Sequence, residues 1–162
     1  MSRYIRPRLP GACLFFTVNL SERGSDLLVR EIAVLRDAVR QTRRERPFGI
    51  DAWVILPDHM HCVWHLPPDD ADYSTRWSVI KARFSRAMPQ MPRRKSHVAR
   101  REHGLWQRRF WEHHIRTTKD WSNHVRYCWM NPVKHGLVAE PSDWPYSSWH
   151  RDNGLGRESG AP

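Results

Sequence analysis

The chain has 162 residues, which is enough for one domain with its own hydrophobic core. Its 27 Lys and Arg against 17 Asp and Glu give a net charge of +10, and it contains nine tryptophans. Basic groups interleaved with aromatic ones are typical of nucleic-acid binding, above all of single strands, whose unpaired bases can stack. A basic protein with a tryptophan-rich core is the alternative.

Cysteine usage and hydropathy exclude several classes of protein. The three cysteines lie far apart and form no Cys-x-x-Cys pair, so neither a disulfide framework nor a zinc ribbon is expected. No apolar run approaches the length of a membrane span, and the first residues lack the apolar core of a signal peptide. We therefore expect a cytoplasmic protein with no membrane partner.

The first part of the chain predicts a basic arm, one helix and three strands. Residues 1–10 are basic and contain prolines, which is typical of an arm. Apolar residues recur at three- and four-residue steps after Ser21 or Ser25, predicting a capped amphipathic helix that reaches about Arg44. Stretches rich in aromatic and β-branched residues predict strands at residues 12–20, 50–56 and 59–66.

The second part predicts two more helices and one more strand. A helix over residues 74–88 is followed by a basic loop at 89–104 and a strand over 106–116. The last helix begins at Thr117 or Thr118 and reaches Asn131, where Pro132 bends or ends it. This order predicts an α+β fold, with a ferredoxin-like antiparallel sheet, helices on one face, and strands 1 and 3 at the centre.

Two histidines, His59 and His61, flank Met60 in the third strand. Alternate side chains of a strand point to opposite faces, so the two imidazoles share one face. Met60, Cys62, Trp64 and Leu66 then face the core. Imidazole is a common metal ligand, so the pair is a candidate metal site, and a half-buried strand with solvated histidines is the alternative reading.

The last helix provides possible partners for this pair. Tyr127 and Asn131 stand one helical turn apart on a polar side, while Trp121, Val125 and Cys128 form a packing stripe. A phenol is a weak nucleophile at neutral pH, but a cation bound by the Asn131 oxygen could polarise a phosphate under attack. A half-buried tyrosine with a solvated hydroxyl is the alternative for Tyr127.

Taken together, these motifs resemble the single-tyrosine HUH transposases, in particular the REP-associated tyrosine transposases (RAYTs). The resemblance runs nearly end to end. It rests on His59-Met60-His61, on Tyr127, and on Asn131-Pro132-Val133-Lys134-His135-Gly136-Leu137-Val138. Further matching segments are Pro10-Gly11, Phe15-Phe16-Thr17-Val18, residues 50–58, 72–77 and 106–112, and Asp143-Trp144-Pro145-Tyr146-Ser147-Ser148.

The resemblance implies a catalytic domain of the HUH endonuclease type over residues 1–150, followed by a flexible tail at 151–162. It implies a nickase and ligase of single-stranded DNA that acts beside repetitive extragenic palindromic hairpins through a 5′-phosphotyrosine link. Tyr127 would be the nucleophile, and His59, His61 and Asn131 would hold Mg²⁺ or Mn²⁺. The protein would act as a monomer or homodimer and associate with the nucleoid when bound to DNA.

Ten basic or histidine side chains are candidate DNA contacts: Arg76, Lys81, Arg83, Arg93, Arg94, Lys95, Arg108, Arg109, Lys134 and His135. One departure from the family pattern is Trp129, because relatives commonly carry histidine two residues after the nucleophile. If that histidine assists proton transfer, His124 or His135 could substitute. The alternative function is a domesticated, catalytically weak or inactive protein that binds single-stranded DNA hairpins.

Overall fold

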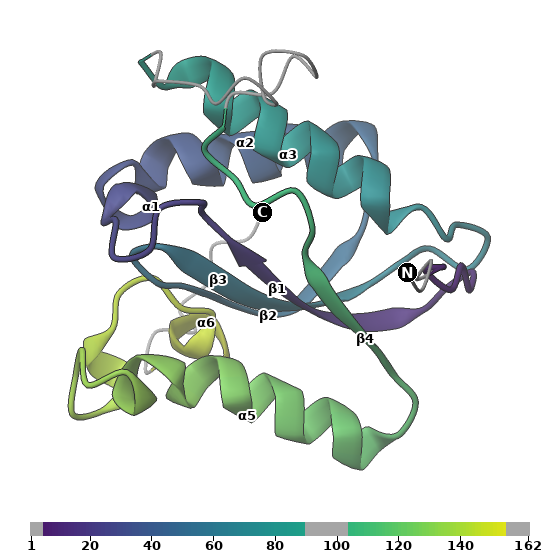
Figure 1. Ribbon diagram of the computed structural model, residues 1–162. Coiled ribbons are helices and arrows are strands. Elements are labelled where there is room, and N and C mark those ends of the chain that lie inside the picture. The colour runs from purple at the N-terminus through teal and green to yellow at the C-terminus, as the bar shows by residue number, and fades with distance from the viewer. Residues whose placement is uncertain (1–4, 90–103, 155–162) are drawn as a thin grey trace.

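A four-stranded antiparallel sheet forms the centre of the protein in the computed structural model, which describes residues 5–89 and 104–154 (Figure 1). The strands are β1 (Cys13–Asn19), β2 (Gly49–Ile55), β3 (His59–His65) and β4 (Trp111–Ile115). Their order across the sheet is β2-β3-β1-β4, with every neighbouring pair antiparallel. The antiparallel α+β architecture and the central position of strands 1 and 3 are therefore confirmed.

Helices cover both faces of this sheet, so the prediction of helices on one face is wrong (Figure 1). Against one face lie α1 (Leu27–Arg30), α2 (Ile32–Glu45) and α3 (Tyr73–Ala87); α5 (Thr118–Lys134) and α6 (Trp149–Asn153) lie on the other side. The physical reason is a second apolar surface on the sheet. Phe15, Val54 and Val63 point away from the main core, and Val125 and Cys128 of α5 bury them.

The side chains of β3 point alternately to the main core and to the opposite face of the sheet, which carries the two histidines. Met60, Cys62, Trp64 and Leu66 belong to the main core under α2 and α3, as predicted, and the Trp64 ring stacks on Trp77 of α3 at 4.3 Å between centroids. The residues between them, including the two histidines, consequently face α5. Packing of the core-facing side chains therefore fixes the position of β3 and, with it, that of the two histidines.

Helix α5 is longer than predicted because Pro132 does not stop it. The helix continues to Lys134 and ends in a Schellman motif, in which Gly136 has a φ of 70°. The Gly136 N–H donates to the carbonyl of Val133, and the Leu137 N–H donates to that of Pro132, each at 2.9 Å. This ending fixes the residue at the helix C-cap, His135.

Two further element boundaries differ from their predicted positions. Strand β4 begins at Trp111 rather than at Trp106, which forms an isolated bridge to Leu20 and donates its indole N–H to Ser85. At the other end, Arg151 of α6 donates to the carbonyls of Ile50 and Asp51. Residues 151–153 are therefore part of the folded domain, and the predicted start of the tail at 151 is wrong.

The basic arm, as far as the structure describes it, is attached to the domain. The Arg6 guanidinium lies 3.7 Å from the Phe110 ring centroid and 3.8 Å from Glu112, and the Tyr73 hydroxyl donates to the carbonyl of Pro7.

None of the described helices is both long enough and apolar enough to cross a bilayer.

Arg76 is a structural residue, which corrects its assignment as a DNA contact. Its relative exposure is 1%, so it cannot meet a phosphate at the surface. Its three guanidinium nitrogens donate to the Asp70 carboxylate and to the carbonyls of Arg46, Pro47 and Asp72. Through these hydrogen bonds the side chain connects the start of α3 with the loop after α2.

We expect Arg76→Ala to lower the free energy of unfolding by about 1.5–3 kcal/mol, because the hydrogen bonds of a buried charged guanidinium are lost while Asp70 stays partly exposed to water. The matched control is Arg40→Ala, which breaks only an exposed pair with Asp37 at 3.4 Å and should cost less than about 1 kcal/mol. Urea unfolding measures both. Equal losses in the two variants would contradict the structural role.

The same ion pair predicts a pH dependence of stability. The hydrogen bonds from Arg76 lower the pKa of Asp70 to about 2. Because the folded-state pKa lies below the ordinary value of 3.8, the stabilisation is complete above about pH 4 and is lost as the pH falls towards 2. The stability difference between wild type and Arg76→Ala should shrink across this window in acid titrations.

Candidate active site

The histidine pair sits on the α5 side of β3, in the middle of the sheet. The His59 and His61 rings meet edge to face with centroids 5.1 Å apart. His61 is only 5% exposed, while His59 lies nearer the surface. A central strand paired on both sides holds the two rings in fixed positions.

Each histidine is held through its Nδ1 atom by a neighbouring oxygen. The Thr17 hydroxyl lies 2.8 Å from Nδ1 of His61, directly across the β1–β3 pairing, and an Asp58 carboxylate oxygen lies 2.6 Å from Nδ1 of His59. Such contacts orient imidazoles and direct the second ring nitrogen, Nε2, at a ligand. This arrangement is the one that metal-binding histidines ordinarily have.

The surroundings of His61 leave its ring able to bind a cation. Burial, followed by the nearby charges of His59, His135 and Lys134, lowers the pKa of His61 to about 3. His61 is therefore neutral at pH 7, with a lone pair available on its ring. The pKa of Asp58 lies below its usual value: burial opposes the shift, but hydrogen bonds, the strongest from His59, outweigh it.

Tyr127 of α5 lies against the buried histidine. Its ring meets His61 edge to face at 5.2 Å and contacts the Phe15 ring at 5.7 Å. The residue is 37% exposed, so a substrate from solvent can reach it. The ammonium group of Lys134 lies 5.1 Å from the centre of the Tyr127 ring, which places a positive charge where an anionic phosphate would approach.

Asn131 is fully buried, and neither polar atom of its side chain has a hydrogen-bond partner among residues 5–89 and 104–154. It stands one turn after Tyr127, which contacts His61, and one turn before His135, whose ring lies 5.2 Å from that of His59. An unpaired buried amide costs about 1–3 kcal/mol. A buried amide that is unpaired beside two histidine contacts is a candidate metal ligand.

The donor set fits a divalent cation. Two imidazole nitrogens and one carboxamide oxygen leave coordination positions open for water and phosphate, as an exchangeable catalytic Mg²⁺ or Mn²⁺ requires, whereas a structural Zn²⁺ is closed in by four protein ligands. The fit rests on the two Nδ1-anchored rings and on the orphaned amide of Asn131.

The predicted DNA contacts divide into several groups. Lys134 and His135 border the site, and Arg108 and Arg109 are exposed just before β4. Lys81 bonds the carbonyl of Gln107, and Arg83 bonds Thr42 and Glu45, so both are partly committed within the protein. Arg93, Arg94 and Lys95 lie outside the described residues.

Trp129 points away from the histidine pair. Its indole N–H donates to Ser148 at 3.3 Å, and its ring packs against the smaller core under α5. Of the two histidines considered as substitutes, His135 contacts His59, whereas His124 packs on Phe15. Sequence reasoning missed three residues of the site: Thr17, Phe15 and Asp58. The pairing of strand 1 with strand 3 was the signal for Thr17 and Phe15.

Comparison with known proteins identifies the family. A REP-associated tyrosine transposase from Escherichia coli K12 is 49% identical over 152 residues, covering 94% of this chain and 85% of that protein. A relative from Haemophilus influenzae, whose name refers to the same family, is 46% identical over 154 residues, covering 94% of this chain and 88% of that protein. No family model matches the chain.

A solved structure agrees with the sequence comparison. It contains a REP-associated tyrosine transposase bound to a REP hairpin, and it superimposes with a TM-score of 0.81 at 49% identity, covering 94% of this chain and 85% of that one. The fold is therefore that of a REP-associated tyrosine transposase. The chain belongs to the REP-associated tyrosine transposase family.

Proposed function

We propose that this protein binds REP-type DNA hairpins and cleaves and rejoins an adjoining single strand through Tyr127. The observation that carries the proposal is the contact between an exposed tyrosine and a buried neutral histidine, beside an amide with no partner among the described residues. The related structure bound to a REP hairpin supports the substrate class.

His59, His61 and Asn131 would together hold Mg²⁺ or Mn²⁺. When bound, such a cation stabilises negative charge that develops on the phosphate under attack. Thr17 and Asp58 keep the two imidazoles in the orientation that a ligand set requires. Lys134, beside the Tyr127 ring, attracts the DNA backbone to the nucleophile.

The proposed reaction exchanges one phosphodiester for another. The Tyr127 oxygen forms a bond to the scissile phosphorus as the bond to the 3′ oxygen of the preceding nucleotide breaks. The phenol proton passes to solvent, and the departing oxygen takes up a proton to become a 3′-hydroxyl. Attack by a 3′-hydroxyl on the 5′-phosphotyrosine reverses these steps and rejoins the strand, so the reaction needs no external energy source.

The direct test is a covalent adduct. Wild-type protein incubated with Mg²⁺ and a 5′-flanked hairpin should give a protein–DNA species that survives a denaturing gel and disappears in EDTA. The circular-dichroism spectrum should be unchanged by EDTA, because the site is exchangeable rather than structural. Full cleavage in EDTA, or unfolding on removal of metal, would contradict the proposal.

Binding should favour unpaired DNA and weaken steeply with salt. Contacts to single-stranded phosphates release counterions, so log Kd should change with log salt by roughly 0.7 per phosphate neutralised. Fluorescence anisotropy should give tighter binding to a hairpin with an unpaired flank than to blunt duplex of the same sequence. Arg93, Arg94 and Lys95, changed together to alanine, should weaken binding while cleavage at saturating DNA persists.

Binding without chemistry is a second candidate function, and Trp129 favours it. This tryptophan stands where relatives commonly have histidine, and its indole faces Ser148 rather than the site. A protein that binds the hairpin tightly but forms no adduct with Mg²⁺ or Mn²⁺ would have this function. The intact set of Tyr127, His59, His61 and Asn131 makes the enzyme the better supported candidate.

A further inference from the structure

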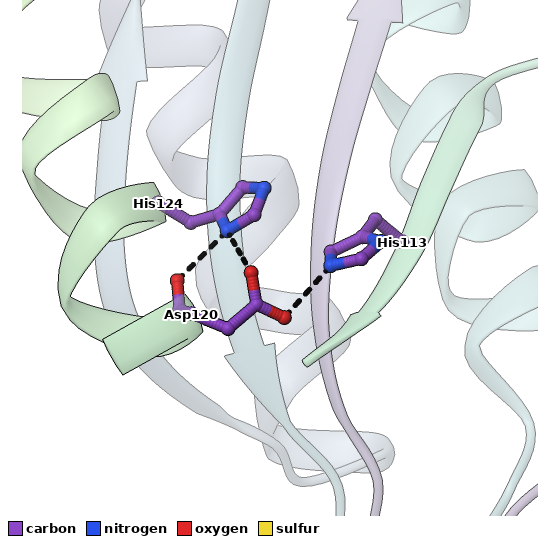
Figure 2. A group of neighbouring side chains, drawn as sticks. All are labelled: His113, Asp120 and His124. Atoms are coloured by element: carbon purple, nitrogen blue, oxygen red, sulfur yellow. Dashed lines mark hydrogen bonds and ion pairs between the residues drawn. The ribbon is translucent and has the colours of Figure 1, made fainter. Parts of the chain in front are cut away.

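A second cluster of ligand-type side chains lies at the other end of α5, and Figure 2 shows its three members. Nε2 of His113 is 2.8 Å from one carboxylate oxygen of Asp120. Nδ1 of His124 is 3.0 Å from the other carboxylate oxygen and 2.8 Å from the main-chain carbonyl oxygen of the same residue. One ligand atom from each residue lies within 4.8 Å of the others. The two imidazoles therefore converge on a single carboxylate.

Local structure holds all three side chains in place. His113 lies in β4 opposite Phe15 of β1, and Asp120 occupies the first turn of α5. There the Thr117 hydroxyl caps the helix by accepting from the Asp120 N–H at 3.1 Å. His124 follows one turn later on the same side, and its ring stacks on that of His113 with centroids 4.8 Å apart.

This cluster is distinct from the candidate active site but adjoins it. The Phe15 ring contacts His124 at 4.7 Å between centroids, and His61 and Tyr127 at 5.7 Å each. No residue is shared between the two sets of donors. A ligand at one site would act on the other only through this aromatic contact and through helix α5.

We propose that His113, Asp120 and His124 form a second metal site, which binds Zn²⁺ and fastens the start of α5 to β4. Two imidazoles and one carboxylate are a zinc ligand set that leaves the fourth position to water. Zn–N bonds of about 2.0 Å require donors roughly 3.3 Å apart, so small side-chain rotations suffice. The Asp120 carboxylate adds a negative charge that the Asn131 amide at the other site lacks, so this set is the closer match to a zinc site.

The proposal goes beyond the strand-transfer function and does not depend on it. The same helix carries Tyr127, which lies one turn after His124. A metal at this site would therefore hold the N-terminal half of the nucleophile helix against the sheet. The competing explanation is an aspartate that merely joins two histidines by hydrogen bonds, with no metal at all.

Zinc titration of a background protein, a variant in which the other candidate site has been removed, distinguishes these explanations. The protein, without any affinity tag, first receives His59→Ala and His61→Ala, so that the other candidate site cannot contribute. Isothermal titration with Zn²⁺ should then show one site per chain. Adding His124→Ala or Asp120→Asn should remove that site or weaken it roughly a hundredfold, since one of three ligands is lost.

The matched control is His65→Ala. Nδ1 of His65 lies 2.7 Å from an Asp51 oxygen, but the pair belongs to no cluster of three potential metal ligands in the described part of the chain. Its removal should leave the zinc isotherm unchanged. Absence of binding in the background protein, or a site that persists in both His124→Ala and Asp120→Asn, would overturn the proposal. A loss of zinc affinity in His65→Ala as large as that in His124→Ala would also overturn it.

A second readout tests the fastening of α5. At about 100 times its Kd, zinc should raise the Tm of the background protein by about 5–10 °C, and His124→Ala should abolish the rise. Hydrogen exchange of amides 118–124 should slow on addition of zinc, with little change in amides of α2. Binding that protects α2 as much as α5 would place the metal elsewhere and refute the proposal.

Discussion

Tyr127→Phe should bind a flanked REP hairpin as tightly as wild type and yet produce neither nick nor adduct. The substitution removes one oxygen and leaves the ring contacts with His61 and Phe15 in place. Because that oxygen is the proposed nucleophile, cleavage should fall by roughly a thousandfold or more. The measurement is single-turnover cleavage at saturating DNA, together with the Kd from anisotropy.

The control for this variant is Tyr146→Phe, which removes a hydroxyl from a tyrosine packed against the main core. It should cleave at the wild-type rate. The account fails if Tyr127→Phe cleaves normally, because no other proposed group could then replace the phenol. A loss of hairpin binding equal to the loss of cleavage would assign Tyr127 a role in binding alone.

The second large effect is a difference between two variants, one that removes a proposed metal ligand and one that removes only the group that orients this ligand. His61→Ala should abolish cleavage at any Mg²⁺ or Mn²⁺ concentration, because one of three proposed ligands is gone. Thr17→Val removes only the hydroxyl that holds Nδ1 of His61. Loss of such an orienting contact typically lowers metal affinity about 10- to 100-fold, so high metal concentrations should restore cleavage.

Metal titrations of cleavage in the two variants make this comparison. The expected outcome is a shifted metal curve that reaches the wild-type plateau for Thr17→Val, and a flat baseline for His61→Ala. Rescue of His61→Ala by Mn²⁺ would remove His61 from the ligand set. An unshifted curve for Thr17→Val would mean that the 2.8 Å contact does not orient the ring.

Much of the site could be predicted from the sequence because it depends on local periodicity. The alternation of His59 and His61 with Met60 and Cys62 determines which residues face the core, and the structure confirms that division. The one-turn spacing of Tyr127 and Asn131 likewise follows from helix geometry alone. Neither inference needs knowledge of distant contacts.

Features that depend on packing between distant segments could not be predicted in this way. Nothing local distinguishes the buried Arg76 from an exposed arginine on an amphipathic helix, since its partners come from the loop before it and from the end of α2. The position of α5 depends on Phe15 and Val63 forming a second apolar face. The cluster of His113, Asp120 and His124 appears only when β4 meets that helix.

The central claim is that Tyr127 forms the covalent link to DNA, and peptide mapping of the trapped wild-type adduct tests it most directly. The adduct is digested with protease and nuclease, and mass spectrometry locates the residual nucleotide. The account predicts the nucleotide on the peptide that contains Tyr127. A nucleotide on Tyr4, Tyr73 or Tyr146 would contradict it.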